Sequence, residues 1–299
     1  MPLDDVHPDL RLATRLIPGQ LAVGRFTLPF ARIAFKALRP IGNRHAEVMD
    51  LSSNVKVRLF RPPNSAVRSA ALLWIHGGGY VLGAAIQDDT MCRRLSDRLG
   101  ITVVSVDYRL APEHPYPAAL HDCYDALTWL AALPEIDPTR IAIGGMSAGG
   151  GLAAALAILA RDRGEVTPAF QLLTYPMLDD RTEPGSEPGR YRVWNPRSNH
   201  FGWQSYLGEA DPAVAVPARQ VDLSRLAPAW IGVGTHDLFH DEGIAYARRL
   251  EEAGVPCQLE LVPGAFHGFD QVVRRAPVTR AFFDAQCASL RTALGVSSA

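Results

Sequence analysis

The sequence predicts an α/β fold: a mostly parallel central sheet with helices on both faces. From about residue 70 to the C-terminus, short β-branched runs alternate with helical stretches, and repeated β-α-β units require parallel strands covered by helices. The chain of 299 residues, 47% hydrophobic and 20% charged, can bury a sizeable core and is unlike a disordered chain. The length and composition of the chain are therefore compatible with the predicted α/β fold.

The N-terminal region predicts two short amphipathic helices. Between residues 3 and 38 the apolar residues recur at helical spacing, and Pro18-Gly19 separates two groups. The apolar positions of these helices are Leu10, Leu12, Leu16 and Ile17 in the first group and Leu21, Phe26, Phe30, Ile33 and Phe35 in the second.

After this region, apolar residues recur at every second position, which is the spacing of a β-strand. Residues 45–51 and 55–60 alternate around Ser52-Ser53-Asn54, which predicts a hairpin, and Pro62-Pro63 ends it. Beyond it, strands are predicted at 70–75, 102–106, 140–143, 170–174, 229–233 and 257–262, and helices at 89–99, 118–130, 148–161, 242–252 and 278–294.

One long segment, from Asp179 to about Pro217, interrupts this alternation. It is rich in Pro, Gly, Arg and Asp but also holds aromatic residues, and long excursions inside compact domains are usually lids or binding loops. We therefore expect residues 1–45 and 181–217 to form a cap, and residues 46–180 and 218–299 to form the two parts of the core.

Charge and cysteine usage restrict the partners and the compartment. The net charge of −1 provides no global positive field for nucleic acid or an anionic membrane, and no apolar stretch is long enough for stable membrane insertion. The four cysteines lack C-x-x-C spacing, so free core thiols are expected. The acidic start does not resemble a secretory signal, which predicts a cytoplasmic protein. A homodimer is compatible with the sequence.

The sharpest motif is Gly145-Met146-Ser147-Ala148-Gly149, between a predicted strand and an alanine-rich helix. A serine on so tight a strand-to-helix turn needs small neighbours, because the strained backbone leaves no room for Cβ atoms on either side. The context predicts that Ser147 is a nucleophile.

A second motif, His76-Gly77-Gly78-Gly79, directly follows the strand at 70–75. Successive glycines let backbone N–H groups point together into a cavity, where they can bind the oxyanion of a tetrahedral intermediate. A phosphate-binding P-loop is excluded because no lysine follows Lys56. A dinucleotide site is also disfavoured, since the G-x-G-x-x-G spacing is missing.

A serine nucleophile needs a base and an acid that orients the base. Asp237 follows the strand at 229–233, and His267 follows the strand at 257–262. The chain order Ser147, Asp237, His267 is that of α/β hydrolases, and all three follow strand carboxyl ends, where open α/β sheets place their sites.

Other residues compete for these roles. Asp241 and Glu242 could replace Asp237 as the acid, but they fit the first turn of the next helix, where acidic residues complement the dipole. His236 and His240 are four apart, as in a metal pair, yet no third ligand is evident. We therefore predict no metal site.

Together these motifs resemble the hormone-sensitive-lipase family of bacterial α/β-hydrolase carboxylesterases. The resemblance extends from about residue 70 to the C-terminus and rests on six elements: 76–83 (HGGGYVLG), 106–113 (VDYRLAPE), 116–119 (YPAA), 147–150 (SAGG), Asp237 with 241–243 (DEG), and 266–269 (FHGF). It implies the α/β-hydrolase fold, a serine carboxylesterase with a cap, and no metal or organic cofactor.

The resemblance also implies that backbone N–H groups of Gly77, Gly78, Gly79 and Ala148 form the oxyanion hole. The sequence departs from the family at Met146, where an acidic residue or a threonine is usual. Aromatic residues of the cap segment could line a substrate pocket or could form the segment's own small core; the candidates for the pocket are Met146, Trp194, Phe201 and Trp203.

We expect hydrolysis of small esters with short to medium acyl chains. An amidase or formamidase, or an acyltransferase, could use the same triad. A small-molecule receptor on this fold is less favoured because His267 is present.

Overall fold

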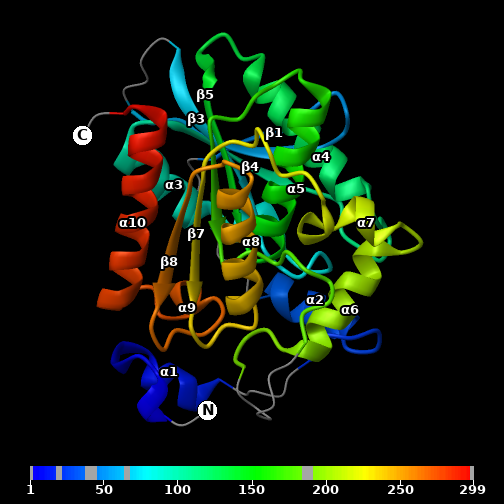
Figure 1. The fold of residues 1–299 in the computed structure, drawn as a ribbon, viewed down its shortest axis with the longest axis vertical. Helices are drawn as coiled ribbons and strands as arrows, with labels where there is room; N and C mark the ends of the chain where they lie inside the picture. Colours follow the sequence, from blue (N-terminus) through cyan, green and yellow to red (C-terminus); the bar gives the residue numbers. More distant parts are fainter. Residues whose placement is uncertain (1–2, 18–21, 38–45, 64–67, 184–190, 297–299) are drawn as a thin grey trace.

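An eight-stranded sheet runs through the protein in the order β1-β2-β4-β3-β5-β6-β7-β8 (Figure 1). The computed structural model describes residues 3–17, 22–37, 46–63, 68–183 and 191–296. The strands are β1 (Glu47–Asp50), β2 (Lys56–Phe60), β3 (Ser69–Ile75), β4 (Thr102–Asp107), β5 (Ile136–Met146), β6 (Phe170–Thr174), β7 (Ala229–Gly234) and β8 (Cys257–Val262).

Strands β1 and β2 form the predicted hairpin, and β2 pairs antiparallel with β4. The other neighbours pair in parallel, which confirms the predicted mostly parallel α/β sheet. Strand β5 begins at Ile136, four residues before its predicted start. The predicted hairpin start at His45 lies outside the described residues.

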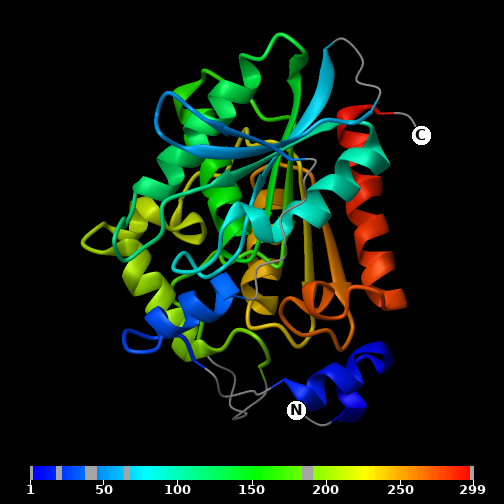
Figure 2. The ribbon, with the colours of Figure 1, turned by 180° about the vertical axis from the view of Figure 1, so that it is seen from behind.

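Helices cover both faces of the sheet (Figure 1, Figure 2). Their bounds are α3 (Asp89–Leu99), α4 (Ala118–Ala131), α5 (Ala148–Arg163), α8 (His240–Glu252), α9 (Phe269–Val272) and α10 (Pro277–Leu294). Helices α3 and α10 lie together on one face, where Figure 2 shows them in front, and α4, α5 and α8 lie on the other.

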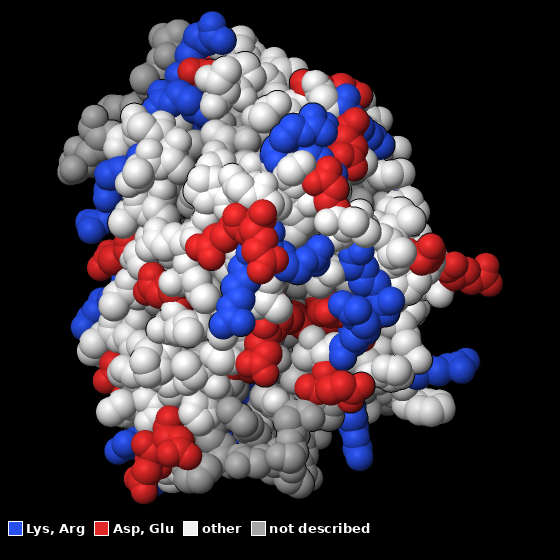
Figure 3. Space-filling model, viewed as in Figure 1, with Lys and Arg blue, Asp and Glu red and all other residues white. Residues whose placement is uncertain are grey.

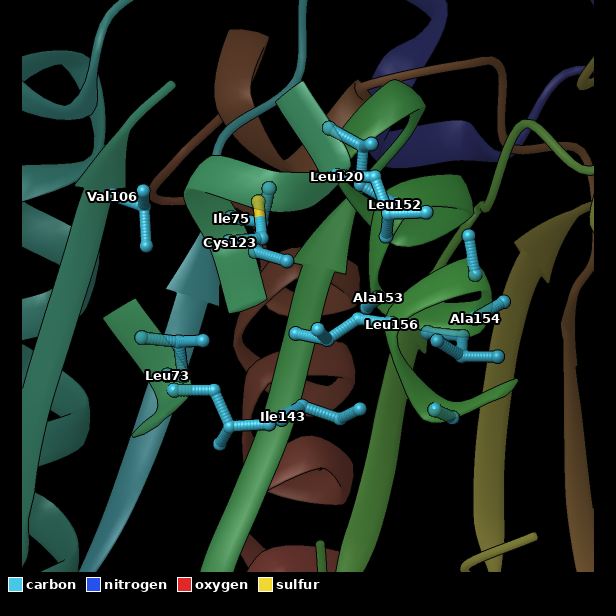
Figure 4. Close-up of a cluster of buried hydrophobic side chains, with 14 of the residues drawn as sticks. Leu73, Ile75, Val106, Leu120, Cys123, Ile143, Leu152, Ala153, Ala154 and Leu156 are labelled. Carbon is cyan, nitrogen blue, oxygen red and sulfur yellow. The ribbon is translucent and has the colours of Figure 1, made fainter. Parts of the chain in front are cut away.

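The alternation of side chains along β3 explains why the sheet has two cores. Leu73 and Ile75 pack with α4 and α5 on one face, whereas Leu72 and Trp74 pack with α3 and α10 on the other. Figure 4 shows the first core, where side chains from β3, β4 and β5 meet those of α4 and α5. Both faces of the sheet are buried, as expected for parallel strands.

The N-terminal region contains helices α1 (Arg11–Leu16) and α2 (Leu28–Ala37), as predicted. Five of the apolar residues that carry the amphipathic pattern are exposed. These exposed side chains are Leu12, Leu16, Phe26, Phe30 and Ile33. In α2 the side that faces the protein is occupied by Leu28 and the hydrogen-bonded Arg32. Pro18-Gly19, Leu21 and Leu38 lie outside the described residues.

The long segment before β7 contains helices α6 (Pro196–Leu207) and α7 (Pro212–Ala215). Asn195 caps α6 with its side chain, which accepts a hydrogen bond from the Ser198 N–H. The segment touches the N-terminal region twice: the Val23 N–H donates to Ser198 Oγ at 2.9 Å, and Arg192 Nε donates to the Thr14 carbonyl at 3.3 Å. These two parts of the chain therefore lie side by side.

Basic and acidic side chains are intermixed over the face seen in Figure 3, with no large area of one sign. All four cysteines are free; Cys92, Cys123 and Cys287 are buried and Cys257 is partly exposed. Within the described ranges, no helix has both the length and the apolar character needed to span a bilayer.

Candidate active site

Ser147 lies at the tight turn between β5 and α5, with φ 55° and ψ −122°. A positive φ is rare for a residue with a side chain, and such strain concentrates at functional sites. The neighbouring glycines make the turn possible. A Cβ on Gly145 or Gly149 would lie 2.5 Å or 2.1 Å from the Ile75 carbonyl oxygen, so α5 could not approach the end of β3.

The structure brings Ser147, His267 and Asp237 into one hydrogen-bonded series. Ser147 Oγ lies 3.0 Å from His267 Nε2, and His267 Nδ1 lies 2.9 Å from Asp237 Oδ2 and 3.0 Å from Oδ1. A carboxylate only accepts, so Nδ1 donates to Asp237 and Nε2 is left to accept the serine proton. All three residues are buried.

The position of Asp237 is fixed by the loop after β7. Its Oδ1 accepts a hydrogen bond from the Phe239 N–H at 2.9 Å, just before α8 begins. The ring of Phe239 also packs edge-on against His267, with centroids 5.0 Å apart. The acid and the base are thus held by the same short segment.

The residues that competed with Asp237 for the role of the acid make other contacts. His240 and Asp241 bond to each other at the start of α8, with Nδ1 and Oδ1 2.7 Å apart. Buried Glu242 accepts hydrogen bonds from the Leu178 N–H and the Thr182 hydroxyl, so it fixes the loop after β6. Among the described residues no group of three or more His, Cys, Asp or Glu side chains is placed to hold a metal ion.

The glycine run bends sharply beside Ser147. Gly78 and Gly79 have φ values of 129° and 59°, in the region that favours glycine. A Cβ on Gly77 would lie 3.3 Å from Ser147 Cβ, so the run lies directly against the serine. His76 supports the run from behind: its ring stacks on Tyr108 at 4.1 Å, and the Tyr108 hydroxyl donates to the His76 carbonyl.

Several backbone N–H groups beside Ser147 have no acceptor among the described residues. The N–H groups of Gly78, Gly79 and Ala148 donate to no other residue that the structure describes. Ala148 is the first residue of α5, where N–H groups have no intrahelical acceptor and the helix dipole favours negative charge. These donors are therefore available to an anionic oxygen.

Two of the four candidate pocket residues lie against the glycine run. Met146 is buried, and its Cγ would lie 3.2 Å from a Cβ on Gly77. The indole of Trp194 covers Gly79 so closely that a Cβ there would lie 2.0 Å from it. Helix α6 also packs closely on the run, because a Cβ on Gly202 would lie 2.7 Å from the Gly79 carbonyl oxygen.

The other two candidates pack among apolar and aromatic side chains. Phe201 is half-buried and packs against the small cluster of Leu28, Val81 and Ala111. Trp203 is buried against Tyr80 and Tyr206.

The sequence did not reveal a polar pair behind His267. The Tyr175 ring lies edge-on to His267 with centroids 4.9 Å apart, and its hydroxyl donates to Asp270 Oδ1 at 2.7 Å. Burial raises the pKa of Tyr175, and the Asp270 carboxyl raises it further; burial also raises the pKa of Asp270. The signals were an aromatic residue directly after β6 and an acidic residue within a buried segment.

A second buried carboxyl, Asp88, lies near this pair and accepts a hydrogen bond from Trp74 Nε1 at 2.8 Å. Burial raises the pKa of Asp88 to about 7; the Trp74 hydrogen bond lowers it and the Asp270 charge raises it. Between pH 3.8, the ordinary pKa of an aspartate, and about pH 7, Asp88 is ionised in the unfolded chain but protonated in the folded one. The free energy of unfolding therefore falls as pH rises through this window.

We expect Asp88→Asn to remove this penalty, because an amide stays neutral and can still accept from Trp74. The melting temperature of the variant minus that of the wild type should increase from about pH 4 to about pH 7 and then level off. Thermal unfolding across this range measures it, with exposed Asp162→Asn as the control for the loss of one carboxyl. A difference that does not change with pH would contradict the assigned cause.

Comparison with known proteins identifies the family of the chain. A profile of the family described as alpha/beta hydrolase fold matches residues 72–271. The chain is 38% identical to an ethyl acetate hydrolase of Pseudomonas putida, over 88% of this chain and 92% of that protein. It is 35% identical to the esterase LipI of Mycobacterium tuberculosis, over 90% and 78%.

Solved structures give the same result over nearly the full length. A bacterial heroin esterase superposes with a TM-score of 0.88 at 36% identity, covering 98% of this chain and 99% of that one. The esterase LipW of Mycobacterium marinum superposes with a TM-score of 0.86 at 32% identity, covering 97% and 96%. The chain therefore belongs to the family with the alpha/beta hydrolase fold and, within it, to the bacterial carboxylesterases that resemble hormone-sensitive lipase.

Proposed function

We propose that this carboxylic ester hydrolase works through an acyl-enzyme intermediate on Ser147. The observation that carries the proposal is the hydrogen-bonded series from Ser147 through His267 to Asp237, placed beside a run of glycines with free N–H groups. A nucleophile, a base and an orienting acid in this arrangement are the parts that acyl transfer requires. No metal or organic cofactor is needed for this chemistry.

In the first half-reaction, Ser147 Oγ attacks the ester carbonyl carbon while His267 Nε2 takes the hydroxyl proton. Asp237 keeps the imidazole in the tautomer that can accept at Nε2 and stabilises the imidazolium that forms. The tetrahedral intermediate collapses, the bond to the alkoxy oxygen breaks, and His267 returns the proton to the departing alcohol. The acyl group remains on Ser147.

In the second half-reaction, water attacks the acyl-enzyme with His267 again as the base, and the carboxylic acid leaves. Both tetrahedral intermediates carry a negative oxygen. We assign its binding to the N–H groups of Gly77, Gly78, Gly79 and Ala148, each donor in contact with the oxygen contributing about 2.7 to 4 kcal/mol to the lowering of the barrier.

The N-terminal region and the segment with α6 act, in this proposal, as a cap over the site. Three contacts support it: Trp194 covers Gly79, Gly202 packs on the Gly79 carbonyl, and Val23 bonds to Ser198. Met146 and Trp194 then limit the space for the acyl group, which favours short to medium chains. The name of the Pseudomonas relative, an ethyl acetate hydrolase, fits a small acyl group.

Turnover of p-nitrophenyl esters with acyl chains from acetate to palmitate tests the substrate class. We expect the highest kcat/KM at short to medium chains and a steep fall toward palmitate, because Trp194 closes the space beside the glycine run. The matched p-nitroanilides serve as the control for an amidase, and added alcohol as the control for acyl transfer. Anilide turnover without ester turnover, or transfer faster than hydrolysis, would contradict the proposal.

A further inference from the structure

Helix α2 exposes large apolar side chains to solvent, and a charged side chain takes part in its contact with the protein. Leu28 is buried, and Arg32, one turn later on the same side, is fully paired. Its guanidinium donates to the Val81 carbonyl at 3.0 Å, to the Ala111 carbonyl at 2.9 Å and to both carboxylate oxygens of Glu113 at 2.6 and 2.8 Å. A charged side chain thus anchors the helix.

The opposite side carries three large apolar side chains. Phe30 and Ile33 are three residues apart on the outer face of α2 and are 73% and 67% exposed; Phe26, in the preceding turn, is 86% exposed. Side chains three residues apart in a helix share one face, so Phe30 and Ile33 form an apolar stripe that exposed Phe26 extends at the start of the helix. A contiguous exposed apolar patch on a monomer generally indicates an interaction surface.

The charge of the N-terminal sequence indicates the partner. Between Leu10 and Ala46 lie seven of the chain's 30 Lys and Arg residues and none of its 31 Asp and Glu residues. Exposed Arg25 and Lys36 flank the apolar stripe at its two ends. Although the total charge is near neutral, residues 11–45 are basic and the rest of the chain is acidic.

We propose that α2 and its preceding turn dock onto the surface of an anionic lipid bilayer. A short helix with an apolar stripe flanked by Lys and Arg lies in the plane of the interface: apolar side chains enter the boundary of the acyl chains, and cations contact the lipid phosphates. Phe26, Phe30 and Ile33 supply the first contact, Arg25 and Lys36 the second. The helix does not span the bilayer.

This surface lies close to the candidate active site. Arg32 and Leu28 pack on Val81, which follows the glycine run by two residues. Docking through α2 would therefore place the glycine run near the lipid surface, where apolar esters concentrate. The inference goes beyond the proposed hydrolysis and does not depend on it, because lipid binding can be measured without turnover.

Co-sedimentation with vesicles tests the proposal. We expect the wild type to bind phosphatidylcholine vesicles that contain phosphatidylglycerol, more tightly at low salt than at high salt, and to bind pure phosphatidylcholine weakly. The triple variant Phe26→Ser, Phe30→Ser, Ile33→Ser should lose at least about tenfold in affinity, since three large apolar side chains no longer enter the interface. Arg25→Gln with Lys36→Gln should remove most of the salt dependence.

The double variant Val214→Ser, Val221→Ser is the matched control, because these valines are 63% and 96% exposed but lie outside α2. It should bind like the wild type, and all variants should keep the wild-type melting temperature and turnover of a soluble ester. Absence of wild-type binding to the anionic vesicles would overturn the proposal. So would a wild-type dimer, seen by light scattering, that the triple variant converts to a monomer, because a second copy would then cover the stripe.

Discussion

Replacing Ser147 by alanine is expected to lower kcat/KM for esters by on the order of a million-fold while leaving the fold intact. Alanine removes only the hydroxyl oxygen, whose contact is His267 Nε2 at 3.0 Å, so the nucleophile is lost and no core contact disappears. The backbone strain at φ 55° is common to serine and alanine, so the melting temperature should stay near the wild-type value. Turnover and thermal unfolding measure the two effects.

Labelling separates loss of the nucleophile from general damage. A fluorophosphonate should add once to the wild type and not to Ser147→Ala, as intact mass and peptide mapping would record. The control is Ser105→Ala in β4, which removes another fully buried serine hydroxyl and should retain both labelling and turnover. If Ser147→Ala hydrolysed esters at the wild-type rate, Ser147 would not be the nucleophile.

The sequence could predict the sheet because its periodic signals are local. The side chains of strand β3 alternate between the two cores. The glycine run follows this strand directly, so the hydrophobic residues of the strand and the turn after it are adjacent in the chain. The meeting of Ser147, Asp237 and His267 was also predictable, since each follows a different parallel strand, β5, β7 or β8, and parallel strands end at one edge.

Features that depend on contacts between residues far apart in the sequence could not be predicted from local patterns. The apolar spacing in α2 predicted a helix correctly but did not say which side meets solvent. That choice depends on Arg32, whose partner Glu113 lies 81 residues further along the chain. Likewise, Trp203 is buried by Tyr80, which lies much earlier in the chain, so its place could not be inferred from its own segment.

The polar pair behind His267 escaped prediction for the same reason. Tyr175 and Asp270 are 95 residues apart, and Asp88, whose charge interacts with Asp270, belongs to yet another segment. The sequence offered only weak signals, because burial in the fold and not residue spacing shifts the pKa of such a carboxyl. Motifs therefore locate the groups expected to react, whereas the electrostatics around them require the structure.

Asp237→Asn is expected to lower kcat by on the order of ten-thousand-fold. The Phe239 N–H donates to Oδ1, so the carbonyl oxygen of the new amide would occupy this position and its NH₂ would take the place of Oδ2, 2.9 Å from His267 Nδ1. An NH₂ group donates and cannot accept, which forces the proton of the imidazole onto Nε2. A protonated Nε2 cannot take the proton of Ser147, and steady-state kinetics would record the loss.

Two neighbouring acids supply the controls for this loss. Asp241→Asn changes a side chain that is 98% exposed and paired only at the surface with His240, so kcat should stay at the wild-type value. Glu242→Gln changes a buried acid that bonds to Leu178 and Thr182, and it should affect the melting temperature more than kcat. A collapse of kcat in Glu242→Gln with activity preserved in Asp237→Asn would move the role of the acid to Glu242. The opposite pattern, with a normal melting temperature for Asp237→Asn, would mean that the tautomer of His267 controls the reaction.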